Sequence, residues 1–353
     1  MTIEGFTAPG LEAVRDAFAA NFAREGDYQE IGAALCVYRD GECVIDLWGG
    51  FADAARTRPW EADTLVNVWS TTKGAAALAV AKCVDRGLIA YDQPIAEVWP
   101  EFAAGGKAEI TIAQVMSHQA GLPGFEAPTT MEDLYDWNGV IARLEAQAPV
   151  FAPGSANCYH AVTYGFLAGE IVRRAAGVSL GRLLRDELAG PADADLFIGL
   201  PAALDARVAE LMAPKSPVDV AAMELSPPAR MALTNPELDP LAANTEAWRR
   251  AELPALNGQA SARGVARLYG LMIDGGGLIS PGVIGQMEAV VADRVDLMLG
   301  FNPQWGMGVA HNLIGVYGSN PRTVGHSGWG GSFGAADPDA RIAIGYVCNQ
   351  MGS

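Results

Sequence analysis

Short apolar runs typical of β-strands occur near both ends of the chain. Apolar runs at 31–38 and 43–48 are separated by Arg39-Asp40-Gly41-Glu42, and Asp-Gly between such runs is a strong hairpin signal. Helical spacing of apolar residues over 10–24 precedes them, so we expect the chain to open helix, strand, strand. Near the C-terminus we expect further short strands at 306–310, 313–317, 332–337 and 341–348.

The middle of the chain is different, because residues 88–210 show helical spacing without convincing strand alternation. Residues 214–254 hold seven of the 21 prolines, which predicts irregular loop. A helix is expected at about 261–274. We therefore predict an α+β fold with an antiparallel sheet flanked by helices and an inserted all-helical region. The predicted sheet domain is 1–87 with 260–353, and the predicted helical domain is 88–259.

Composition narrows the function classes. The chain has 353 residues and 50% hydrophobic residues, which is typical of a globular protein and not of a disordered one. A net charge of −17 argues against nucleic acid or anionic membrane partners. The first ten residues lack a basic and apolar signal sequence, and no apolar stretch is long enough to span a bilayer, so we expect a cytoplasmic protein.

The five cysteines are scattered without a Cys-x-x-Cys pair, which fits neither a zinc site nor a disulfide framework. We expect buried thiols, although Cys36 and Cys43 could approach each other across the hairpin. His160 and His311 offer no metal-ligand spacing, so neither a metal nor a cofactor is expected. The oligomeric state is left open.

Ser70-Thr71-Thr72-Lys73 lies where a loop becomes a helix that closes at Gly87. A spacing of three puts the serine hydroxyl and the lysine amine on one face, one turn apart. Backbone N–H groups at a helix start also favour developing negative charge. The alternative is that Ser70 only caps the helix and Lys73 is a surface charge. With 12 serines and 4 lysines, about 0.14 such pairs are expected by chance.

Two further segments support catalysis. The turn Pro153 to Tyr159 delivers a tyrosine shortly before a helix at 164–176, and the glycine-rich run 325–332 leads into a strand. Together with Ser-x-x-Lys, they resemble the serine β-lactamase and penicillin-binding-protein superfamily, most closely the class C-like branch that includes the family VIII carboxylesterases. Residues 117–123 and 337–339 are also similar to that family, with less specific motifs.

The resemblance implies a role for each matching residue. Ser70 is implied as the nucleophile, Lys73 as its base, and Tyr159 as the hydroxyl that passes a proton to the leaving group. His326-Ser327-Gly328 stands where the family has a Lys-Thr-Gly strand. The backbone N–H of Trp329 would then join that of Ser70 as the oxyanion hole.

The sequence departs from the family pattern in three places, and the first two bear on the substrate. The run Tyr159-His160-Ala161 lacks the asparagine that β-lactam-active members place two residues after the tyrosine, and His326 replaces a lysine. Both changes weaken recognition of an anionic amide. The family also places a helix after the last strand, whereas this sequence stops at Ser353, which leaves open whether that helix is missing, short or replaced by a neighbour.

We therefore predict a serine hydrolase that cleaves short-chain carboxylic esters through an acyl-enzyme. An apolar cleft walled by the proline-rich segment and Phe125 is the basis for expecting a short acyl group. The alternatives are a β-lactamase or D-amino peptidase-type amide hydrolase, an acyltransferase with the same Ser-Lys-Tyr site, or a silent relative that binds peptides.

A rival interpretation starts from Gly-x-Ser-x-Gly, which occurs around Ser179 and Ser332. In α/β-hydrolases the histidine follows the nucleophile, and none follows His326, which excludes Ser332. Ser179 lies between two helical segments, where Gly177 is expected to end one helix and Ser179 to begin the next. The Tyr-x-Ser at Tyr317 falls in a predicted turn, and His118 and Gln119 are interpreted as structural.

Overall fold

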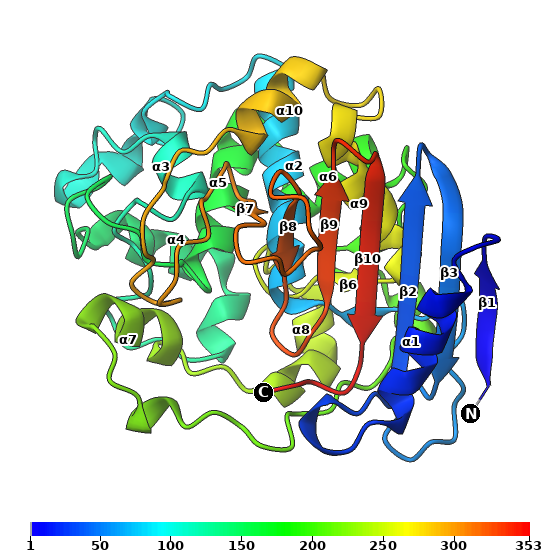
Figure 1. Cartoon of the computed structure of the whole chain (residues 1–353). Helices are drawn as coiled ribbons and strands as arrows, with labels where there is room; N and C mark the ends of the chain where they lie inside the picture. The colour runs from blue at the N-terminus through cyan, green and yellow to red at the C-terminus, as the bar shows by residue number, and fades with distance from the viewer. Residues whose placement is uncertain (1) are drawn as a thin grey trace.

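A seven-stranded antiparallel sheet built from both ends of the chain is the scaffold of the protein (Figure 1). The computed structural model describes residues 2–353. The strand order is β1-β3-β2-β10-β9-β8-β7. The bounds are β1 (Ile3–Thr7), β2 (Gly32–Arg39), β3 (Glu42–Gly50), β7 (Ala310–His311), β8 (Val324–Ser327), β9 (Phe333–Asp337) and β10 (Ile342–Cys348).

A helix packs against each face of this sheet (Figure 1). On the near face in that view, α1 (Glu12–Ala23) buries Phe18 and Phe22 against apolar side chains of β2, β3 and β10. On the far face lies α9 (Ala262–Asp274), whose Arg263 forms a two-pronged ion pair with Asp46 of β3. The central strands β2, β3 and β10 are therefore packed on both sides.

The inserted helical region lies beside the sheet, and α2 runs between the two (Figure 1). Eleven residues of α2 are buried, including the run from Thr72 to Ala81, because an alanine-rich helix can be packed on all sides. The other helices are α3 (Ile112–Met116), α4 (Trp137–Ala146), α5 (Thr163–Ala176), α6 (Leu180–Leu184), α7 (Pro227–Thr234), α8 (Glu246–Arg250) and α10 (Pro281–Glu288), with α2 at Thr72–Asp85.

A second, three-stranded sheet has the order β4-β6-β5 and lies at the junction. Its strands are β4 (Val66–Asn67), β5 (Leu196–Phe197) and β6 (Gln259–Ala260). Since β4 ends three residues before Ser70, this small sheet fixes the chain that leads into Ser70. None of the helices described in residues 2–353 combines the length and hydropathy needed to cross a bilayer.

The predicted α+β architecture is confirmed, as are the 31–48 hairpin, the helix at 261–274 and the last two strands. The expected opening is wrong, because β1 precedes the first helix as a short edge strand. Residues 313–317 form a loop, and of 306–310 only Ala310 belongs to a strand. The expected domain boundaries remain a prediction.

The proline-rich segment 214–254 is also not wholly irregular, since it contains α7 and α8. The side chain of Ser226 caps α7, and Pro227 and Pro228 occupy its first positions. Proline is well tolerated there because the first N–H groups of a helix have no partner within the helix. The same prolines that suggested a loop therefore mark a helix start.

Candidate active site

Ser70 and Lys73 meet at the start of α2, as their spacing predicts. Ser70 lies in a short 3₁₀ helix, Trp69–Thr71, that continues directly into α2. The Lys73 Nζ is 3.0 Å from the Ser70 Oγ. Trp69, just before the serine, has a φ of 47°, which is a strained conformation for a bulky residue and typical of functional sites.

Lys73 is fully buried, and its environment favours the neutral amine. Besides Ser70, its Nζ contacts two backbone carbonyls, those of Ala161 at 2.8 Å and Ala255 at 3.1 Å. Burial lowers the pKa of Lys73 well below its usual value. A neutral amine has two N–H donors for the two carbonyls and one lone pair, which is left facing the Ser70 hydroxyl. The arrangement is that of a base poised beside a nucleophile.

Tyr159 completes the group that the sequence predicted. The Lys73 Nζ lies 4.7 Å from the centre of its ring. Burial raises the pKa of Tyr159 far above its ordinary value, although the Ser70 side chain partly opposes this. The tyrosine therefore stays protonated and can act as a proton donor.

The turn after β8 approaches the serine closely. A Cβ on Gly328 would lie 2.2 Å from the Val68 carbonyl oxygen and 2.3 Å from the Ser332 Oγ, so only glycine fits. Ser332 donates a hydrogen bond to the Val68 carbonyl at 2.8 Å and contacts Thr71 Oγ1 at 3.1 Å. Ser332 is thus a buried link between the two loops, which is a structural role.

The backbone N–H of Trp329 has no hydrogen-bond acceptor among residues 2–353, whereas those of Gly328 and Gly331 do. Trp329 comes directly after Gly328, which lies against the carbonyl of Val68. Val68 is two residues before Ser70, so the Trp329 N–H lies close to the serine. The Trp329 side chain is 40% exposed and packs edge-on against Trp69, with ring centres 5.0 Å apart. These are the properties needed for one arm of an oxyanion hole.

His326 is buried in β8 beside the same group. Its Nδ1 lies 2.9 Å from the Ser327 carbonyl oxygen, and its Nε2 has no partner among the described residues. Burial, with a smaller contribution from Lys73, lowers the pKa of His326 to about 3. The imidazole is therefore neutral at physiological pH and supplies no positive charge.

Sequence reasoning missed several residues that build this site. Trp248 packs on Trp69 with ring centres 5.3 Å apart, and Trp305 stacks on Tyr159 at 5.8 Å. The Tyr269 hydroxyl donates to the Thr71 carbonyl at 2.6 Å. These residues are far from the motifs along the chain, so no local pattern could have indicated them.

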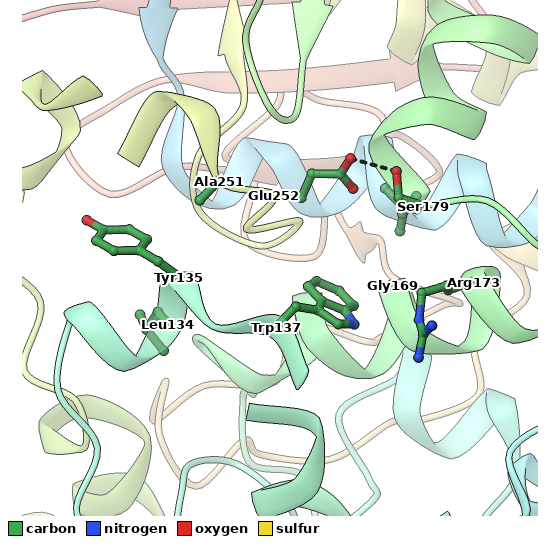
Figure 2. Close-up of a pocket in the computed structure, with 9 residues that line it drawn as sticks. Leu134, Tyr135, Trp137, Gly169, Arg173, Ser179, Ala251 and Glu252 are labelled. Carbon is green, nitrogen blue, oxygen red and sulfur yellow. Dashed lines mark hydrogen bonds between the residues drawn. The ribbon is translucent and has the colours of Figure 1, made fainter. Parts of the chain in front are cut away.

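The Ser179 alternative is settled by its contacts. Ser179 caps α6 by accepting a hydrogen bond from the Arg182 N–H, and its Oγ donates to Glu252 Oε1 at 2.6 Å. Figure 2 shows this pair at the edge of a cavity of about 240 Å³. No histidine is among the residues lining that cavity, so Ser179 lacks the base that a nucleophile elbow needs.

Two smaller expectations need comment. Phe125 is 1% exposed and packs in the main core, so its ring offers almost no surface to a substrate and the expected cleft wall is wrong. Gln119 binds Ser117 Oγ at 2.8 Å and is structural, as interpreted. His118 is buried too, but its ring centre lies only 4.7 Å from that of Tyr159.

Comparison with known proteins identifies the family. Residues 15–353 match the family described as Beta-lactamase. The chain belongs to the β-lactamase family. A family VIII carboxylesterase of known crystal structure shares 47% identity and a TM-score of 0.93, over 100% of this chain and 95% of that one. A penicillin-binding-protein homologue from Caulobacter crescentus shares 42% identity and a TM-score of 0.91, over 99% and 94%.

The esterase/β-lactamase LipL of Mycobacterium tuberculosis is 36% identical over 376 residues, which cover 98% of this chain and 83% of LipL. The resemblance stated from sequence is thus confirmed, and so is the β-lactamase-like fold. These relatives support a serine hydrolase that acts on esters.

Proposed function

We propose that this β-lactamase family member hydrolyses short-chain carboxylic esters through an acyl-enzyme on Ser70. The observation that carries the proposal is the buried Lys73 amine, 3.0 Å from the Ser70 Oγ and bound on its other sides by two carbonyls. A neutral amine in this position can take the hydroxyl proton as the oxygen attacks.

In the acylation step, the Ser70 Oγ bonds to the ester carbonyl carbon while its proton passes to Lys73. The carbonyl oxygen becomes an oxyanion held by the N–H groups of Ser70 and Trp329. The bond to the alcohol then breaks, and Tyr159 protonates the leaving oxygen and regains a proton from Lys73. In the second step, water attacks the acyl carbon while one of its protons passes to the neutral Lys73. The bond between the acyl carbon and the Ser70 Oγ then breaks, the Oγ regains a proton from Lys73, and the acid is released.

The charge at position 326 favours esters over β-lactams. The pKa of His326 is lowered to about 3, so the residue is neutral where β-lactam-active members carry a lysine. A β-lactam carboxylate would therefore find no cation on this strand. In addition, Ala161 contributes its carbonyl to Lys73 and has no side-chain amide for a drug's acyl-amino group.

The expected short acyl chain rests on the aromatic residues around Ser70. Trp69 is held between Trp248 and Trp329, and only Trp329 is substantially exposed. The exposed Trp329 ring beside the nucleophile is held in place by the buried Trp69, and it leaves little room for a long chain. For p-nitrophenyl acetate, butyrate and octanoate, we expect kcat/KM to fall from butyrate to octanoate.

The test is hydrolysis of p-nitrophenyl butyrate by the wild type, Ser70→Ala and the matched control Ser179→Ala, with folding checked by circular dichroism. We expect Ser70→Ala to lose at least ~10³-fold in kcat and Ser179→Ala to keep wild-type turnover. With nitrocefin, kcat/KM of the wild type should be at least ~100-fold lower than with the ester. An active Ser70→Ala variant, or faster turnover of nitrocefin, would contradict the proposal.

A further inference from the structure

Asp296 is a buried carboxylate that the proposed reaction does not use. It has no exposed surface and lies in the segment between α10 and β7. Its Oδ1 accepts hydrogen bonds from the backbone N–H groups of Met298 and Leu299, at 2.9 and 3.1 Å. The third donor is the N–H of Tyr159, at 3.0 Å. A single buried oxygen thus joins its own loop to the backbone of the proposed proton donor.

Asp296 forms no ion pair with a lysine or arginine among residues 2–353. Its charge is held by backbone N–H groups, and Trp305 Nε1 lies 3.5 Å from Oδ2. Burying a carboxylate without a cation is costly unless its oxygens are well hydrogen-bonded. A neutral amide would make a similar turn with less cost, so the charge itself calls for an explanation.

His118 holds the same segment from the other side. Its carbonyl oxygen accepts the Cys158 N–H at 3.2 Å, and its Nδ1 accepts the His160 N–H at 3.1 Å. The residue is fully buried and has a φ of 62°, a strained backbone conformation for a side chain of this size. The three consecutive N–H groups from Cys158 to His160 are therefore bound by only two residues, Asp296 and His118.

The ring of Tyr159 is held as well as its backbone. Trp305 stacks on it with ring centres 5.8 Å apart and planes 14° apart, and the His118 ring lies at 4.7 Å. Trp305 in turn contacts Asp296 through Nε1 and His118 at 4.5 Å between ring centres. Asp296, His118 and Trp305 form one packed unit around the tyrosine.

We infer that Asp296 and His118 are positioning residues for Tyr159, which hold its hydroxyl where it protonates the leaving alcohol; this inference rests on the proposed function. The negative charge adds a second effect. Asp296 raises the pKa of Tyr159 beyond the effect of burial, which keeps the proton on the hydroxyl until the leaving oxygen accepts it.

The effect of a misplaced Tyr159 should depend on the leaving group of the ester. p-Nitrophenolate leaves as a stable anion and needs little help from an acid, whereas ethoxide must be protonated as it leaves. A misplaced Tyr159 therefore slows acylation by ethyl butyrate more than by p-nitrophenyl butyrate. The ratio of the two kcat/KM values is independent of how much of a variant is folded, so partial unfolding leaves it unchanged.

The experiment compares this ratio in the wild type, Asp296→Asn, His118→Leu and the matched control Asp293→Asn. Asp293 is an exposed acid three residues away in the same loop. We expect Asp296→Asn and His118→Leu to increase the preference for the p-nitrophenyl ester at least ~10-fold, and Asp293→Asn to leave it unchanged. Equal losses on both esters would overturn the inference, because a purely structural role lowers both alike.

A double-mutant cycle tests whether Asp296 acts through Tyr159. In the Tyr159→Phe background the preference should already be raised, and adding Asp296→Asn should change it less than ~2-fold. A full additional effect in that background would overturn the inference. Failure of the proposed function is distinguishable, since the wild type would then hydrolyse neither ester, or Ser70→Ala would hydrolyse both.

Discussion

The Lys73 amine and the Ser70 hydroxyl are 3.0 Å apart, and two backbone carbonyls also contact the amine. The lysine is fully buried and the serine is half-buried. In the neutral amine, the lone pair of Lys73 faces the Ser70 hydroxyl. Burial removes its charge, and the carbonyls of Ala161 and Ala255 fix its two N–H groups.

Replacing Lys73 by arginine should abolish turnover. A guanidinium keeps its proton at all accessible pH values, so it cannot accept one from Ser70. We expect kcat on p-nitrophenyl butyrate to fall by ~10³-fold or more, as is usual for loss of an essential base. The matched control is Lys82→Arg, nine residues further along α2, which should keep wild-type activity. Near wild-type turnover of Lys73→Arg would exclude Lys73 as the base.

The activity should depend on pH through Lys73. Only the neutral amine accepts a proton, so activity is present above the pKa of Lys73 and is lost as the pH falls through it. Since burial lowers this pKa far below the ordinary lysine value, kcat/KM should already be on its plateau at neutral pH. The raised pKa of Tyr159 keeps that plateau intact on the alkaline side. A profile that rises steadily to about pH 10 would show an ordinary lysine instead.

Gly328→Ala should damage the oxyanion hole. The added methyl group would lie 2.2 Å from the Val68 carbonyl oxygen, so the turn after β8 must move and take the Trp329 N–H with it. We expect kcat to fall by ~100-fold, the usual loss for one oxyanion donor, with a smaller change in KM. Gly285→Ala in α10 is the control, because its Cβ meets no atom within 4 Å. Unchanged kcat in Gly328→Ala would contradict the proposed role of the Trp329 N–H as an oxyanion donor.

His326 should make the folded state sensitive to acid. Its pKa is about 3 when folded and 6.5 when unfolded, so the unfolded state binds more protons between these values. The contribution is present above about pH 6.5 and is lost as the pH falls toward 3. Between about pH 7 and pH 5, His326 should cost ~2 kcal/mol in unfolding free energy. In guanidine unfolding, the free energy of unfolding of His326→Gln should fall between pH 7 and pH 5 by ~2 kcal/mol less than that of the wild type. Equal losses in the two proteins would contradict the argument from the burial of His326.

Local patterns in the sequence were sufficient to locate the proposed nucleophile and its proposed base. Ser70 and Lys73 are three residues apart on one helix, so their contact depends only on helix geometry. The hairpin at Asp40-Gly41 is likewise a local event, and both residues adopt positive φ as such a turn requires.

The parts that could not be predicted depend on contacts across the fold. Asp296 reaches Tyr159 across 137 positions of the sequence, and its loop has no motif of its own. The strained φ of Trp69 also depends on packing by Trp248 and Trp329. β1 was missed because its three central residues are exposed, which leaves no apolar pattern to detect.

The central claim is that Ser70 becomes acylated, and trapping the covalent adduct tests it most directly. The protein is incubated with a p-nitrophenyl phosphonate ester, digested, and analysed by mass spectrometry. The account predicts one adduct per chain, on the Ser70 side chain, absent in Ser70→Ala and formed much more slowly in Lys73→Arg. An adduct on any other residue of the wild type, or one that forms at the same rate in Lys73→Arg, would contradict it.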